Sequence, residues 1–228
     1  MIEIDGSQGE GGGQMLRTAL SLSCISGKGF RISQIRKSRE KPGVMRQHLV
    51  AVQAAARIAG AEVAGDRLGS VQLSFVPRRP MAGDYHFDIG TAGSTSLVLQ
   101  TVIPPLLRAG GSSRLTLIGG THVPFSPSWH YLAGVFAPTI ARLGVRLQLN
   151  LESCGFYPKG GGRVHCRVEP APHLSPISVE ERGRLLGISG YSAVGNLPVT
   201  IAFRQWQSAR SRLREALGGE VPMDVGIQ

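Results

Sequence analysis

The sequence of 228 residues contains few cysteines, no long apolar run and no basic leader. Its three cysteines, Cys24, Cys154 and Cys166, show no CxxC or Cys/His spacing, which argues against structural zinc and against a disulfide framework. No apolar run approaches the roughly 20 residues that a membrane-spanning helix needs. Residues 1–5 do not resemble a secretion signal. We therefore expect reduced thiols and a cytoplasmic protein with no membrane partner.

Several common catalytic motifs are also missing. The sequence has no Walker lysine motif, no Rossmann fingerprint and no nucleophile elbow, which argues against P-loop nucleotide hydrolases, dinucleotide-dependent enzymes and serine hydrolases. None of the histidines has a carboxylate, serine or cysteine partner at a recognisable catalytic spacing, so packing or surface roles are expected for them. The six histidines are His48, His86, His122, His130, His165 and His173.

Acidic residues are scarce relative to basic ones. The chain has 25 Lys and Arg against 15 Asp and Glu, a formal net charge of +10. This balance favours a polyanionic partner such as RNA or DNA. The excess is concentrated in residues 31–46, which hold six basic residues and one acid, Glu40. Electrostatic binding of nucleic acid through this segment is therefore expected to weaken as salt rises.

The chain repeats one structural pattern twice. Each copy reads as strand, Gly-rich loop, helix, strand, loop, helix, strand, strand, with the copies at about residues 1–80 and 81–170. The pattern predicts an α+β fold built from units of two helices on a four-stranded sheet. We expect the helices of the first copy at residues 14–25 and 45–59, and those of the second at 94–100 and 129–143.

The pattern loosens after residue 170. A strand is expected at residues 185–194 and a helix at 201–217. We assign residues 1–184 to a core of two complete units. Residues 185–228 are expected to begin an incomplete third unit and a small domain inserted in it, so the chain reads as shortened, and exposed edges left by the missing part could favour a dimer.

A glycine run opening into a helix is the strongest candidate for a binding site. Residues 9–17 read GEGGGQMLR. Consecutive glycines let a ligand approach the backbone N–H groups, and a helix N-terminus favours an anion. Gln14 and Arg17 lie i, i+3 on one helical face, so both can point at a ligand held by the loop. Glu10 could hold a metal or orient a hydroxyl.

Further loops repeat this design or add to it. Residues 88–94 form a second small-residue loop before a helix, and 119–127 offer prolines and an aromatic that could flank a flat base. Residues 157–162 form a cationic turn. The basic residues 36–41 precede the second helix, where arginine forks suit phosphate groups. Because these loops occupy equivalent ends of repeated units, we expect them to converge.

These motifs, in this order, resemble the RNA 3'-terminal phosphate cyclases over about residues 3–170. The resemblance rests on GEGGGQ with Arg17, KPG with RQH at residues 41–48, GTAGS with LVLQT at 90–101, GGT at 119–121, and GFYP with GGG at 155–162. It implies the cyclase and enolpyruvyl transferase-like fold, two complete units and the start of a third with its inserted domain.

The resemblance also implies an enzyme of the ligase class that uses ATP and a divalent metal, Mg²⁺ or Mn²⁺. Such an enzyme converts an RNA 3'-phosphate into a 2',3'-cyclic phosphate through enzyme–AMP and RNA–AMP intermediates. Glu10, Arg17 and Arg39 would be catalytic, with Glu10 contacting the metal. Arg36, Arg39 and Gln47 would bind the phosphate and the RNA end. ATP would be held by Gln14 on its phosphate side and by Gln100, Pro127 and Tyr131 around the adenosine.

One element of the family pattern is missing from these residues. The nucleophilic histidine of the family lies in a motif such as His-x-Ala-Asp-Gln, and the sequence does not contain it. We therefore expect this chain to be inactive by itself. Two alternatives stay open: a non-catalytic cyclase-like RNA-binding factor, and an enolpyruvyl transferase, which shares the repeated unit but would need a phosphosugar or shikimate-type site.

Overall fold

The computed structural model describes residues 1–217 and 223–227, and within the strand at 223–227 it describes the backbone alone. The chain divides into two compact units, residues 1–177 and 178–228. We call these the first and second units and describe each by itself. The first unit contains both of the repeats, at about residues 1–80 and 81–170.

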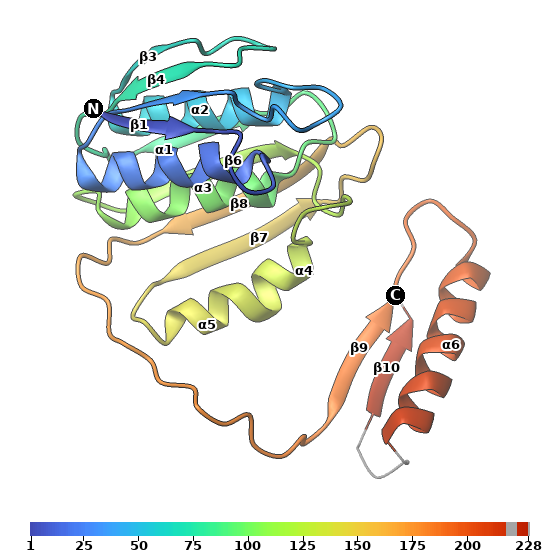
Figure 1. Cartoon of the computed structure of the whole chain (residues 1–228). Coiled ribbons are helices and arrows are strands. Elements are labelled where there is room, and N and C mark those ends of the chain that lie inside the picture. Colours follow the sequence, from blue (N-terminus) through green and yellow to red (C-terminus); the bar gives the residue numbers. More distant parts are fainter. Residues whose placement is uncertain (218–222, 228) are drawn as a thin grey trace. The chain divides into compact units, whose positions relative to one another are not determined.

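The first unit contains two four-stranded mixed sheets of identical topology (Figure 1). In each sheet the first two strands of the repeat are parallel and the other pairings are antiparallel. The first sheet has the order β1 (Ile2–Asp5), β2 (Phe30–Ser33), β4 (Leu73–Val76), β3 (Glu62–Ala64). The second has the order β5 (Asp84–Asp88), β6 (Ser113–Gly119), β8 (Gly162–Val168), β7 (Leu147–Ser153). The predicted α+β class and its duplicated unit are confirmed.

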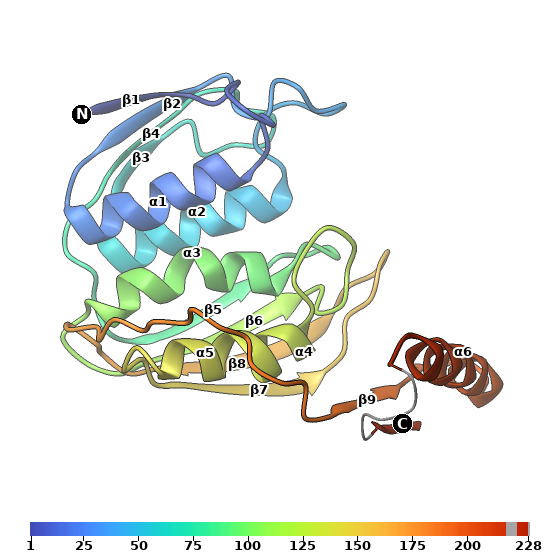
Figure 2. The same ribbon diagram turned by 60° about the horizontal axis from the view of Figure 1, so that its bottom comes forward.

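Helices fill the space between the two sheets (Figure 2). In the first repeat they are α1 (Gln14–Ser26) and α2 (Arg46–Ala59), and in the second α3 (Thr95–Leu107) lies against both of them. The predicted end of this helix at residue 59 is confirmed, and Gly60 caps it in the left-handed conformation with φ of 55°.

Helix α2 is buried on two faces and belongs to both hydrophobic cores. Val50, Ala54 and Ile58 pack in the core of the second repeat, whereas Leu49 and Val52 pack in the core of the first. A helix that is apolar on opposite sides is expected between two layers. This packing fixes the two repeats to each other, and with them the loops at their ends.

The helix predicted at residues 129–143 is present but irregular. It consists of α4 (Trp129–Tyr131), a π-helical turn η1 (Leu132–Phe136) and α5 (Ala137–Ala141). Pro138 has no backbone N–H and cannot donate an α-helical hydrogen bond. Just before it, at residues 132–136, the wider π-helical hydrogen-bond pattern replaces the α-helical one.

Helix α3 runs beyond the predicted end at residue 100. It continues through Pro104 and Pro105 to Leu107, although prolines usually disrupt a helix interior. Ile103, Pro105 and Leu106 are buried, so packing against the core offsets the lost backbone hydrogen bonds.

The second unit consists of β9 (Ile188–Ser192), α6 (Val199–Leu217) and β10 (Met223–Ile227), with the two strands parallel. The strand and helix predicted here are present, whereas β10 was not predicted. Of the predicted incomplete third unit, residues 218–222 and 228 lie outside the described residues. Within the described part of the chain, no helix combines the length and hydropathy that crossing a bilayer requires.

Candidate functional site

A cavity of about 1010 Å³ lies in the first unit at the end where β1, β2, β5 and β6 lead into their loops. Parallel strands bring their carboxyl ends to one edge, so loops from both repeats meet there. The residues that line it include Glu10, Gly12, Gly13, Gln14, Arg17, Arg36, Arg39, Gln47, His48, Ser94, Val123, Phe125, Ser126 and Tyr157. The structure thus brings together six of the predicted site residues.

The glycine loop lies very close to the basic side chains. A Cβ on Gly12 would come within 3.1 Å of Arg39 Nη2, and one on Gly13 would lie 2.0 Å from His48 Nε2. Gly9 and Gly11 have φ of 61° and 57°, the left-handed region that glycine adopts without strain. The loop therefore needs glycine for close approach at Gly13 and for its backbone conformation at Gly9 and Gly11.

Arg17 is a buried cation on α1, with 7% of its surface exposed. Its Nη2 donates to Gln14 Oε1 at 2.7 Å, which confirms that the two side chains share a helical face. Nε of Arg17 is buried without a hydrogen-bond partner, and no carboxylate of the described residues lies within 4.0 Å of the guanidinium. Burial lowers the pKa of Arg17 to about 10, so it stays protonated at neutral pH. Burying a cation without a counter-charge is costly, and a bound anion would offset that cost.

The segment 34–45 carries two further arginines into the cavity. Arg36 adopts the left-handed conformation, with φ of 54°, and its Nη1 donates to the carbonyls of Lys41 at 2.7 Å and Gly43 at 3.0 Å. Burial, and then the nearby positive charge of Arg39, lower the pKa of Arg36. Arg39 forms a 3.5 Å ion pair with Glu10, whose side chain is 89% exposed. Of the described residues that line the cavity, Glu10 is the one carboxylate.

His48 lines the cavity, although the spacing of the histidines predicted only a packing or surface role for it. The backbone N–H of Met45 donates to its Nδ1 at 3.3 Å, so the proton of the neutral ring lies on Nε2, the atom beside Gly13. Burial, followed by the charges of Arg36 and Arg17, lowers the pKa of His48 to about 3. His48 therefore presents a neutral N–H donor near the cations of Arg36 and Arg17.

This burial predicts a loss of stability in mild acid. His48 has a pKa of about 3 when folded, against about 6.5 in an unfolded chain. Its contribution is therefore present above pH 6.5 and is lost as the pH falls from there toward 3. Between pH 7 and pH 5 the loss should approach about 2 kcal/mol in the free energy of unfolding, measured by urea titration. The variant His48→Gln should lose less over the same interval, and an equal loss in both proteins would contradict the prediction.

Gln47 connects the repeats. Its Oε1 accepts a hydrogen bond from the backbone N–H of Ser94 at 2.7 Å, and Arg46 Nε donates to the carbonyl of Ile89 at 3.2 Å. Ser94 caps α3, its hydroxyl accepting from Leu97 N at 3.3 Å. Because the carbonyl oxygen of Gln47 is already used, its Nε2 is the group left to face the cavity.

The residues predicted around the adenosine are not among those that line the cavity. Gln100 and Tyr131 are exposed on α3 and α4, and Pro127 is partly buried directly after Ser126. Their role in holding ATP stays a prediction.

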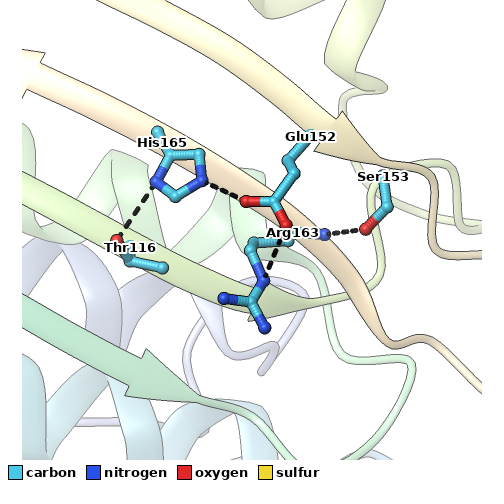
Figure 3. Close-up of polar contacts among 5 residues, drawn as sticks. All are labelled: Thr116, Glu152, Ser153, Arg163 and His165. Atoms are coloured by element: carbon cyan, nitrogen blue, oxygen red, sulfur yellow. Dashed lines mark hydrogen bonds and ion pairs between the residues drawn. The ribbon is translucent and has the colours of Figure 1, made fainter.

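A second polar cluster lies on the face of the second sheet turned away from its core (Figure 3). His165 contacts Thr116 through Nδ1 at 3.2 Å and Glu152 through Nε2 at 2.7 Å, and Arg163 Nε lies 3.4 Å from the other oxygen of Glu152. The backbone N–H of Arg163 donates to Ser153 Oγ at 3.1 Å, beside a register shift between β7 and β8. None of these residues lines the cavity. The cluster joins three strands where the ladder is irregular.

The cysteines are all free thiols. Cys24 and Cys166 are buried in different cores, and burial raises the pKa of each to about 12, whereas Cys154 is exposed. No group of three or more metal-ligating side chains is found in the part of the chain that the structure describes.

Comparison with known proteins gives a consistent result. The sequence model of the RNA 3'-terminal phosphate cyclase family matches residues 8–225. Curated RNA 3'-terminal phosphate cyclases are 48% identical in Koribacter versatilis and in Nostoc punctiforme, over 93% and 95% of this chain. The cyclase of Hyperthermus butylicus is 45% identical over 100% of it. The chain spans 60–64% of the length of these relatives.

A solved structure, the enolpyruvyl transferase NikO from Streptomyces tendae, is similar with a TM-score of 0.40 and 12% identity, covering 79% of this chain and 32% of that one. The family model covers every residue that lines the cavity. The chain belongs to the RNA 3'-terminal phosphate cyclase family.

Proposed function

We propose that the cavity binds the 3'-phosphate end of RNA for ATP-dependent conversion to a 2',3'-cyclic phosphate. The observation that carries this proposal is Arg17, a buried cation with no carboxylate within 4.0 Å among the described residues, with Arg36 and Arg39 in the same cavity. A terminal phosphate brings two charges and three acceptor oxygens, which suits several guanidinium groups. An RNA 3'-hydroxyl end brings neither.

His48 supports the same ligand. Its neutral Nε2–H can donate to a phosphate oxygen without adding a further buried charge, and the backbone of the glycine loop lies against the same ring. The positive end of α1 adds to this field. Each of these groups favours a phosphate over a neutral ligand such as a sugar.

The cavity offers a divalent metal one carboxylate, that of Glu10. Glu10 alone cannot enclose Mg²⁺, but Mg²⁺ is usually held by one or two carboxylates together with substrate phosphates. Glu10 would then exchange its ion pair with Arg39 for the metal. The metal, when bound, would neutralise charge on the phosphates of ATP and RNA.

The reaction we propose is the one that the resemblance implies. A histidine displaces pyrophosphate from ATP and carries AMP, the RNA 3'-phosphate takes the AMP from it, and the RNA 2'-hydroxyl attacks that phosphate and releases AMP. The 228 residues do not contain the expected histidine motif, and the last histidine is His173. We propose that this chain alone binds the RNA end without forming enzyme–AMP. A cytoplasmic location and the possible dimer stay predictions.

Binding of matched RNA oligonucleotides tests this proposal. An RNA ending in a 3'-phosphate should bind at least roughly tenfold more tightly than the same RNA with a 3'-hydroxyl, measured by fluorescence anisotropy of a 5' label. Arg39→Ala should weaken binding of the phosphorylated RNA by roughly fivefold, a modest amount because the side chain is half exposed.

The matched control is Arg31→Ala, which removes an exposed arginine outside the cavity lining whose ion pair with Glu3 is also 3.5 Å long. It should leave the preference for the 3'-phosphate unchanged. Equal affinity of the wild-type chain for both RNA ends would refute the proposed ligand. Acid-labile AMP on the chain after incubation with α-labelled ATP and Mg²⁺ would refute the absence of enzyme–AMP.

A further inference from the structure

Two exposed aromatic side chains line the cavity together with the arginines. Phe125 is fully exposed, and Tyr157 is 73% exposed. Phe125 also has a left-handed backbone, with φ of 60°, which a bulky residue rarely adopts. Folding has therefore placed a large apolar ring in water and in a strained conformation at the binding cavity, a combination typical of functional sites.

Hydrogen bonds and a ring contact connect the loops that carry these two aromatics. The loop that carries Phe125 is tied to the loop that carries Tyr157 through Thr121, whose Oγ1 accepts from Gly155 N at 2.9 Å. The ring of His122 stacks on Phe156, with centroids 5.5 Å apart. Ser126 Oγ donates to the carbonyl of Val123 at 3.1 Å across the turn that presents Phe125.

Basic side chains and exposed aromatics in one cavity are the combination that binds single-stranded nucleic acid. The cations hold the phosphates, and each aromatic ring stacks on a base, whatever its identity, because every base has a π-face. Stacking on a ring face does not read the hydrogen-bonding edge of a base. The cavity should therefore select unpaired ends without strong sequence preference.

We infer that Phe125 and Tyr157 form a stacking site for the last nucleobases of an RNA strand whose 3'-phosphate lies among Arg17, Arg36 and Arg39. This inference rests on the proposed function and adds the specificity for the RNA end. ATP also carries a nucleobase, so the shared chemistry is a base face. Two aromatic side chains beside several cations suit successive bases of a strand better than the single base of ATP.

The test uses the full 228-residue chain and a 3'-phosphorylated RNA with 2-aminopurine as its last base, whose fluorescence falls on stacking. The wild-type protein should quench it. Phe125→Ala should remove most of the quenching and weaken binding roughly tenfold, whereas Phe125→Trp should retain both. The matched control is Phe203→Ala, an exposed phenylalanine on α6 that does not line the cavity. It should behave as wild type.

The outcomes separate this inference from the proposed function. Unchanged quenching and affinity in Phe125→Ala, with an unchanged melting temperature, would overturn the stacking site and leave phosphate binding intact. Quenching of 2-aminopurine riboside triphosphate but not of the RNA would also overturn it, because the base site would then belong to the nucleotide. Phe125-dependent quenching that is equal for 3'-phosphate and 3'-hydroxyl RNA would support the stacking site and refute the proposed phosphate ligand.

Discussion

Replacing Arg17 with methionine is expected to weaken binding of 3'-phosphorylated RNA by about 100-fold while raising the melting temperature. The loss follows because a buried guanidinium makes charge-assisted hydrogen bonds worth about 1.5–3 kcal/mol each, and two such bonds can reach this factor. The gain follows because Arg17 is 7% exposed and has no acidic partner within 4.0 Å among the described residues. Removing an uncompensated buried charge should stabilise the fold by about 1–3 kcal/mol.

The two effects are measured on one preparation, by anisotropy with labelled RNA and by thermal unfolding. Arg17→Lys keeps the charge but not the planar fork, so its affinity should lie between those of the wild type and Arg17→Met. Arg78→Met changes an exposed arginine that lies outside residues 31–46 and outside the cavity lining, and it should alter neither quantity. If Arg17→Met instead lowers the melting temperature, the bond from Arg17 to Gln14 is structural and our interpretation of the site is wrong.

The repeated architecture of the first unit could be predicted because each element has a local signal. Alternating strands, helical periodicity at residues 45–59 and the stop at Gly60 are all encoded within a few residues. The continuation of α3 through Pro104 and Pro105 depends instead on packing, since Ile103, Pro105 and Leu106 are buried. The π-helical turn before Pro138 is not explained by burial, because Leu132 is the one buried residue of residues 132–141.

Part of the candidate site could likewise be predicted from the sequence. The convergence of the glycine loop with the basic segment follows from the repeat, since equivalent strands end at one edge of each sheet. The neutral state of His48 does not follow, because it arises from burial beside Arg17 and Arg36, which no local pattern encodes. The bond from Gln47 to Ser94 likewise joins residues 47 positions apart.

The segment that presents Arg36 depends on a glycine whose replacement should be severe. Gly43 has φ of 80°, and its carbonyl accepts from Arg36 while its N–H donates to the carbonyl of Ile35 at 2.8 Å. A Cβ at this position would lie 2.4 Å from the carbonyl oxygen of Gly69. Backbone atoms held by hydrogen bonds cannot move aside cheaply. Gly43→Ala should therefore cost about 3 kcal/mol or more of unfolding free energy and lower the melting temperature by several degrees.

Gly69→Ala provides a matched control for Gly43→Ala. Gly69 has almost the same backbone conformation, with φ of 76°, but a Cβ there would meet no atom within 4 Å. Its replacement should cost about 1 kcal/mol, the strain of the left-handed backbone alone. RNA binding should fall in Gly43→Ala even well below its melting temperature, because the clash displaces the carbonyl that orients Arg36, and should be retained in Gly69→Ala. Equal destabilisation of the two variants would mean that the contact between Gly43 and Gly69 yields easily, and that another part of the loop fixes Arg36.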